Sequence, residues 1–170
     1  MLRTHTAGEL TEVNIDNEVV LAGWVDRLRD LGQLFFLNIR DRYGVTQCVY
    51  DGSSQDTALL DQLKGLANEY CIQVKGRVRR RETKDNAGEG VAAIEVVLDA
   101  LTVLNKSEVL PLQVRDDSKV SDELRLKYRY LDLRRPCMQE NMLIRHKTLQ
   151  AARTALSGMG FFTKSPSANA

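Results

Sequence analysis

The order of short apolar segments between residues 18 and 104 constrains the fold more than any other feature of this sequence. Apolar runs of strand length recur there between polar turns, which predicts strands over 18–27, 34–40, 45–50, 71–79 and 93–98, the last of which can extend to 104. Between the third and fourth strands, residues 57–69 carry apolar side chains at helical spacing behind the polar segment 53–56, which can cap a helix.

Three strands, a helix and two further strands form the element order of the OB-fold, a small Greek-key barrel. Gly23 inside the first strand indicates a bend or bulge of a closed sheet. The stretch from Asp41 to Gly44 is typical of a hairpin turn. We therefore predict a mainly β, five-stranded OB-fold barrel with an inserted helix, and a generic five-stranded barrel is the alternative.

After the last strand the pattern changes. Residues 105–120 contain Pro111 and a polar stretch, which predicts a linker. Ser121 begins a helix-capping pattern, and Pro136 suits the first turn of a longer helix to about residue 157. One face of that helix would be apolar: Met138, Met142, Leu149, Ala152 and Leu156. We expect a barrel domain at 1–104, a linker at 105–120, and at 121–170 the helical beginning of a further domain that cannot build a core alone.

Composition excludes several classes of function. The chain has 24 Lys plus Arg against 23 Asp plus Glu, so its net charge of +1 gives no argument for a nucleic-acid partner and local clusters must supply one. No apolar run approaches the ~20 residues of a membrane span. The three cysteines form no Cys-x-x-Cys pair, and His5 and His146 lie far apart. We expect a reduced, cytoplasmic chain without membrane contact, metal site or catalytic residues.

The predicted second strand places an aromatic side chain on a polar face. Alternation puts Phe35, Leu37 and Ile39 in the core, so Phe36 points outward. An outward aromatic side chain can stack on an unpaired base. The alternative is an edge that packs under a loop or helix.

The fourth strand is strongly basic. Arg77, Arg79 and Arg81 share the face opposite the core, and Lys75 and Lys84 add to the positive charge. Guanidinium groups suit phosphates, so this row predicts contacts with a nucleic-acid backbone. A solvated charged strand is the alternative.

Two further polar residues suit base recognition. Glu95 is expected outside the core, where its carboxylate can accept a hydrogen bond from the amine of cytosine or form an ion pair with a neighbouring arginine. Gln47 can pair with a base edge, but alternation places it on the face of Val45 and Val49. Either this strand is bulged or the face assignment is wrong.

Longer segments of the chain resemble the N-terminal part of bacterial-type aspartyl-tRNA synthetases, over roughly residues 1–162. The most specific is the thirteen-residue run from Leu124 to Pro136. The other matching segments are Arg3–Thr6, Gly8–Leu10, Gly23–Val25, Arg29–Gly32, Phe36, Arg40–Gly44 and Gln47.

The resemblance implies an OB-fold that binds the tRNA anticodon, a hinge and a class II catalytic domain. Phe36 would stack on the central anticodon uridine, Gln47 would read the edge of that uridine, and Glu95 would accept from the cytosine at the third position. Three arginines would contact the anticodon bases or the neighbouring stem and loop: Arg29, Arg79 and Arg81. Leu31 favours the type that charges tRNA-Asp alone.

For a whole enzyme the resemblance implies ATP, magnesium, tRNA-Asp and a homodimer. The class II motifs that bind ATP, aspartate and the acceptor end are absent here, and Phe162 passes directly to a short polar segment. The catalytic domain is therefore expected to be truncated and this chain alone inactive, with no cofactor of its own. The alternatives are a stand-alone OB-fold module for single-stranded nucleic acid, or the same region of an asparaginyl- or lysyl-tRNA synthetase. The run from Leu124 to Pro136 counts against a stand-alone module, which has no need of it. Glu95 counts against the asparaginyl and lysyl enzymes, because their anticodons lack a cytosine at the third position.

Overall fold

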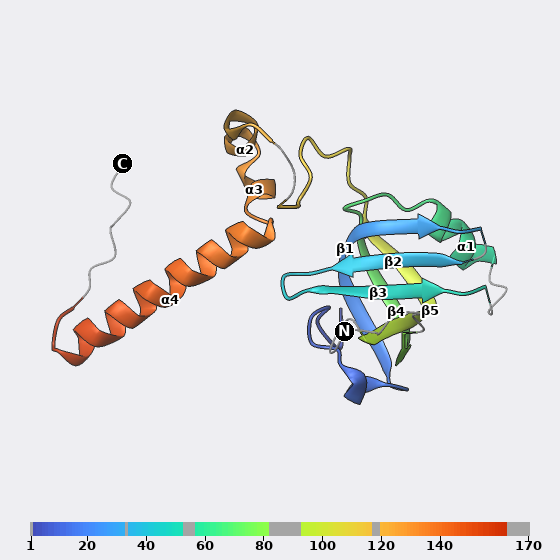
Figure 1. Ribbon diagram of the computed structural model, residues 1–170, viewed down its shortest axis with the longest axis horizontal. Helices are drawn as coiled ribbons and strands as arrows, with labels where there is room; N and C mark the ends of the chain where they lie inside the picture. Colours follow the sequence, from blue (N-terminus) through green and yellow to red (C-terminus); the bar gives the residue numbers. More distant parts are fainter. Residues whose placement is uncertain (1, 33, 53–56, 82–92, 117–119, 163–170) are drawn as a thin grey trace. The chain divides into compact units, whose positions relative to one another are not determined.

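A computed structural model describes residues 2–32, 34–52, 57–81, 93–116 and 120–162. It divides into two compact units, Met1–Val109 and Leu110–Ala170 (Figure 1). Several predicted features lie outside the described residues: the helix cap at 53–56, Lys84, part of the linker at 117–119 and the last segment, 163–170.

The first unit is a closed barrel with the strand order β1-β2-β3-β5-β4. Its strands are antiparallel neighbours except for β3 and β5, which pair in parallel. The predicted OB-fold is thus confirmed. Its elements are η1 (Glu12–Asn14), β1 (Glu18–Asp30), β2 (Phe35–Arg40), β3 (Val45–Tyr50), α1 (Thr57–Lys64), β4 (Cys71–Arg80) and β5 (Ile94–Asn105).

Several element ends differ from the sequence-based prediction, most by one residue. β1 continues three residues further, to Asp30, because it pairs with β2 up to the turn. β5 continues to Asn105, because β4 pairs with it along its whole length. The helix predicted over 57–69 ends at Lys64, and Glu69 adopts a positive φ of 66° on the way into β4.

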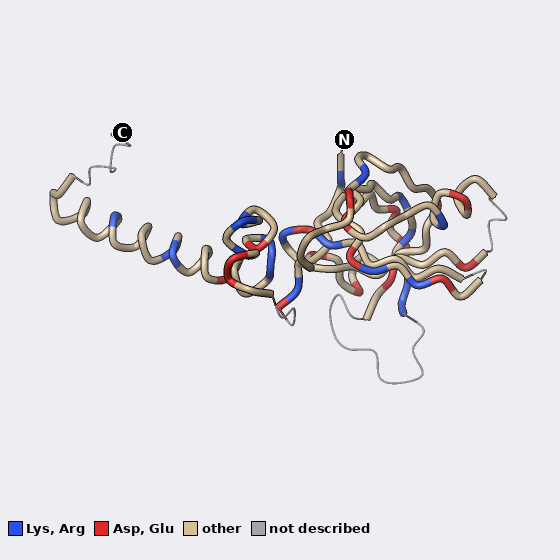
Figure 2. The backbone as a smooth tube through the Cα atoms, turned by 90° about the horizontal axis from the view of Figure 1, so that it is seen from above, with Lys and Arg blue, Asp and Glu red and all other residues tan. Residues whose placement is uncertain are grey.

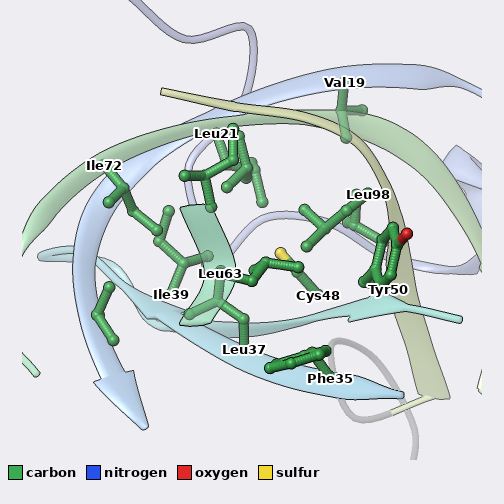
Figure 3. Close-up of a cluster of buried hydrophobic side chains, with 14 of the residues drawn as sticks. Val19, Leu21, Phe35, Leu37, Ile39, Cys48, Tyr50, Leu63, Ile72 and Leu98 are labelled. Atoms are coloured by element: carbon green, nitrogen blue, oxygen red, sulfur yellow. The ribbon is translucent and has the colours of Figure 1, made fainter. Parts of the chain in front are cut away.

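Alternate residues of each strand fill the barrel (Figure 3). The predicted core residues of the second strand, Phe35, Leu37 and Ile39, are all fully buried. α1 adds Leu59 and Leu63 to the same cluster. This core fixes which side chains of every strand must point outward.

Gly23 predicted a bend or bulge of the first strand, and the bulge of β1 lies a few residues after that glycine. The register with β2 shifts between Val25 and Arg27. Gly23 serves a close approach instead, since a Cβ there would lie 2.4 Å from the carbonyl oxygen of Arg40 in β2. The glycine therefore marks tight strand contact and the bulge follows it by a few residues.

The second unit is helical: α2 (Asp122–Lys127), α3 (Arg129–Asp132) and α4 (Pro136–Gly158). The Ser121 hydroxyl accepts from the Leu124 amide, which confirms the predicted cap. Asp132 is fully buried and accepts from Arg125 and Arg135 at 3.0 and 3.1 Å. These arginines hold the pKa of Asp132 below its usual value, with the Arg125 hydrogen bond the largest cause.

α4 contains no buried residue, and its predicted apolar stripe is exposed within this chain except at Met138, which is half-buried. Met142 and Leu149, for example, keep 48% and 45% of their surface accessible. Among the described residues, no helix combines the length and the apolar character that crossing a bilayer requires.

Candidate nucleic-acid interface

The predicted interface residues lie on the outer side of the barrel, on β1 to β5 and, for Arg81, directly after β4. Gln47 joins them there, because the core side of β3 is formed by Cys48 and Tyr50. The β2–β3 register runs without a shift through the pair Asn38 and Gln47, so β3 has no bulge against β2. The assignment of Val45 and Val49 to the core face was therefore wrong.

The reason for that error is that the outer face is itself partly apolar. Val49 is 1% exposed although it lies outside the central core cluster, and its cross-strand partners are Phe36 in β2 and Val97 in β5. Apolar character in β3 thus does not tell the two faces apart.

Phe36 and Arg29 form the aromatic part of the interface. They are cross-strand partners in β1 and β2, and the Arg29 guanidinium carbon lies 5.2 Å from the centre of the Phe36 ring. Arg29 is exposed and Phe36 half-buried. A guanidinium over an aromatic ring is a favourable contact and leaves two planar groups on which a base can stack.

Glu95 is the centre of the polar part. It lies on the outer side as predicted, but it is only 4% exposed rather than free in solvent. Its Oε1 accepts from Arg79 Nε at 2.8 Å and its Oε2 accepts from Gln47 Nε2 at 3.2 Å. A buried carboxylate needs such partners. The ion pair with a neighbouring arginine, which the sequence offered as an alternative role for Glu95, is therefore present.

Two more residues extend this network. Arg81 Nη2 donates to Gln47 Oε1 at 2.9 Å, and Arg79 Nη1 donates to Asp51 Oδ2 at 3.2 Å. We call the resulting series Arg81–Gln47–Glu95–Arg79–Asp51 the polar chain. Partial burial acts to lower the pKa of Arg79, but the hydrogen bonds and charges of Glu95 and Asp51 outweigh it and raise that pKa.

The structure thus brings all six predicted residues to the outer side, in two groups. Arg29 and Phe36 form one, and the polar chain holds the other four. Sequence reasoning missed Asp51, which only marked the end of a strand. The signal that could have pointed to Asp51 was the row of arginines in β4. Glu95 alone cannot pair with all of them, so a further carboxylate nearby was to be expected.

The basic row of β4 is partly neutralised within the barrel. Lys75 pairs with Glu18 at 2.9 Å and Arg79 pairs with two acids, while Arg81 donates to the neutral Gln47. Figure 2 shows basic and acidic residues interspersed along the barrel strands. The prediction of a row devoted to phosphates is therefore incomplete, since Arg79 and Arg81 also hold Glu95 and Gln47.

The arrangement suits recognition rather than reaction. Glu95 offers acceptors, the Gln47 amide offers a donor and an acceptor, and Phe36 offers a ring face. In the part of the chain that the structure describes, no group of His, Cys, Asp or Glu could hold a metal ion. Burial raises the pKa of the Cys48 thiol to about 12, with a smaller contribution from Glu95, which argues against nucleophilic use of that cysteine.

Comparison with known protein families relates this barrel to domains that bind nucleic acids. Residues 19–104 match the model described as OB-fold nucleic acid binding domain. The chain belongs to that family. Residues 121–166 match a second family model, that of class II tRNA synthetases of the D, K and N type.

Individual proteins that are similar to this chain agree with both family matches. The chain is 44% identical over 161 residues to an aspartate–tRNA ligase of Halalkalibacterium halodurans, and 41% identical over 160 residues to an aspartate–tRNA(Asp/Asn) ligase of Persephonella marina. These alignments cover 94% of this chain but only 27% and 26% of the relatives, so the chain spans about a quarter of their length.

A solved structure covers both units. The asparaginyl-tRNA synthetase of Pyrococcus horikoshii aligns with a TM-score of 0.82 at 27% identity, over 98% of this chain and 38% of that protein. The predicted relation to class II synthetases, with an anticodon-binding barrel followed by the start of the synthetase region, is thereby confirmed.

Proposed function

We propose that this chain recognises the anticodon of tRNA-Asp, as the N-terminal part of an aspartate–tRNA ligase. The observation that carries the proposal is a buried carboxylate, Glu95, held next to the Gln47 amide on the outer side of an OB-fold barrel that also exposes the Phe36–Arg29 pair. Phosphates would be repelled by a carboxylate, whereas a base amine would be bound by it.

Each residue then has a chemical role. Phe36 stacks on the central uridine, Gln47 pairs with the edge of that base, and Glu95 accepts from the exocyclic amine of the third base, cytosine. Arg29 contacts the anticodon bases or their backbone. Arg79 and Arg81 keep unused N–H groups after binding their partners in the barrel, and these face the anticodon stem or loop.

The whole enzyme would use ATP and magnesium to activate aspartate and would transfer it to tRNA-Asp as a homodimer. Similarity to aspartate–tRNA ligases along 94% of this chain supports this extension. The barrel would contribute by raising the affinity for the cognate tRNA, and the catalytic steps would belong to the class II domain.

The test measures binding of the 170-residue chain to two anticodon stem-loops, one with G-U-C and one with G-U-U, across a salt series. These RNAs differ in one base, so their phosphate contacts cancel in the ratio of dissociation constants. We expect a preference of about tenfold for G-U-C, in the range of one specific base contact, that persists as salt rises. Equal affinities that vanish with salt would overturn the assignment of base contacts.

The same experiment addresses a second candidate, a synthetase region that also accepts tRNA-Asn. It is favoured by the Persephonella relative, whose name includes both tRNAs, and by the asparaginyl-tRNA synthetase structure. Strong and equal binding of both stem-loops at high salt, with loss of both on Phe36→Ala, would support this candidate. Leu31, which is exposed directly after β1, favours instead the type of synthetase that charges tRNA-Asp alone.

A further inference from the structure

The polar chain fixes the orientation of the Gln47 amide. A glutamine can place its oxygen and nitrogen in either of two ways, and its neighbours decide which. The Glu95 carboxylate can only accept and the Arg81 guanidinium can only donate. Gln47 must therefore turn Nε2 to Glu95 and Oε1 to Arg81, as the distances of 3.2 and 2.9 Å show.

This orientation determines what remains for a base. The second N–H of Gln47, the second lone pair of its oxygen and the remaining lone pairs of Glu95 are the groups left by the polar chain. Their pattern is useful only while the Glu95 carboxylate keeps its own orientation. That orientation depends on Arg79, which donates to Oε1 at 2.8 Å.

Arg79 is a weak anchor by itself. Its side chain is 36% exposed, and a long exposed arginine has many rotamers to choose from. Its second ion pair, to Asp51 at 3.2 Å, joins it to the end of β3. Asp51 thus holds the guanidinium from one side while Glu95 holds it from the other.

We propose that Asp51 is a positioning residue for base discrimination, which acts by holding Arg79 against Glu95 and so fixes the donors and acceptors presented to the third anticodon base. The inference rests on the proposed anticodon recognition. In this role Asp51 acts through Arg79 and needs no contact of its own with the RNA. Its effect is on the difference in affinity between two RNAs, not on affinity as such.

Two simpler roles for Asp51 make different predictions. As a surface ion pair alone, it would affect only stability, by a small amount. As an isolated negative charge near RNA, it would weaken binding of every RNA alike. Only positioning changes the ratio of affinities for G-U-C and G-U-U.

The test compares wild type with Asp51→Asn and with a matched control, Glu12→Gln. Glu12 pairs with Arg80, the next residue of β4, whose side chain alternates to the other side of that strand. Both variants remove one negative charge and one arginine ion pair from the barrel. Binding to both stem-loops and thermal unfolding are measured for all three proteins.

We expect Asp51→Asn to lower the G-U-C preference about threefold or more, a loss within the range of one oriented base contact. The salt slope should stay as in wild type, and Glu12→Gln should keep the full preference. Arg79→Lys should lose preference too, since one ammonium group cannot form the paired fork of a guanidinium, and combining it with Asp51→Asn should add little.

The proposal is overturned if wild type prefers G-U-C and Asp51→Asn keeps that preference, whatever happens to its melting temperature. A rise in affinity for both RNAs with an unchanged ratio would likewise reject it and leave the charge role. Absence of any preference in wild type would instead count against the proposed function, so the two failures are distinguishable.

Discussion

At the scale of single residues, the interface depends on a few side chains whose surroundings define their chemistry. Phe36 has a guanidinium over its ring, and Glu95 has two donors on its two oxygens. Neither role is visible in the residue type alone. Each follows from the register that places cross-strand partners at the same level of the barrel.

Replacing Phe36 by alanine should remove the stacking platform. We expect a loss of about 1–3 kcal/mol in binding free energy. The loss should be the same for both anticodon stem-loops, because both carry the uridine that stacks on Phe36. Tyr43→Ala is the matched control, since Tyr43 is also outward and has Arg3 5.7 Å from its ring centre, in the β2–β3 turn. Isothermal titration of both variants is the measurement, and equal losses would show that Phe36 has no special role.

Replacing Glu95 by glutamine should reduce base discrimination more than overall affinity. An amide still accepts one hydrogen bond but loses the charge that binds a cytosine amine strongly and pairs with Arg79. We expect the G-U-C preference to fall towards one while circular dichroism keeps its native form. Glu18→Gln, which removes an exposed ion pair, is the control. Unfolding of the Glu95 variant would reveal a purely structural ion pair.

Cys48 should be inert in the folded chain. It is fully buried, and its pKa of about 12 against a usual 9.0 leaves about a thousandfold less thiolate near neutral pH. Titration with a disulfide reagent at pH 8 should modify Cys71 and Cys137, which are partly exposed, and reach Cys48 only after denaturant is added. Rapid modification of three thiols in native buffer would contradict the packing of β3.

At the scale of elements, strand alternation is reliable where one face is clearly apolar and fails where both are. It predicted the core residues of β2 correctly, because Asn38 and Arg40 mark the other face. It failed in β3, whose outer side includes the buried apolar residue Val49 beside Phe36 and Val97. Family resemblance, which depends on motifs and not on faces, placed Gln47 among the interface residues nevertheless.

Ion pairs between strands were predicted only in part: the sequence suggested that Glu95 pairs with a neighbouring arginine, but it did not suggest Asp51. The Arg79 contact to Asp51 requires that β3 and β5 pair in parallel and that β4 lies beside β5. Nothing in a local pattern states which strands are neighbours. Hence the basic row of β4 and the candidate partner Glu95 were visible in the sequence, whereas the partner Asp51 was not.

Substitution of Gly76 tests how closely β4 and β5 must approach each other for the barrel to close. A Cβ at this position would lie 2.0 Å from the Val97 carbonyl oxygen, at the point where the β4–β5 register shifts. The backbones must separate to admit an alanine, so we expect Gly76→Ala to destabilise the barrel by about 1–3 kcal/mol or more. Urea unfolding followed by tryptophan fluorescence measures this. Gly158→Ala, where the added Cβ would point into open space, is the control.

At the scale of the whole molecule, the two units differ in what stabilises them. The barrel has a continuous buried core. In the second unit, α4 has no buried residue, and the described buried residues all lie before it: Leu112, Val114, Leu131, Asp132 and Arg135. The chain has one tryptophan, Trp24 in β1, so its fluorescence reports the barrel alone. Helical circular dichroism is dominated by the 23 residues of α4.

These two signals should therefore separate on heating. A helix without tertiary packing melts gradually, because nucleation is unfavourable and each added residue contributes little, while a packed core melts cooperatively. We expect the ellipticity at 222 nm to fall over a broad, lower range and the Trp24 fluorescence to change in one sharp transition. A Leu149→Gly substitution should lower the helical signal further, since glycine costs about 1 kcal/mol in a helix, and leave the fluorescence midpoint unchanged. Coincident transitions, or a fluorescence midpoint that shifts with Leu149, would mean that α4 unfolds as part of the barrel's cooperative unit.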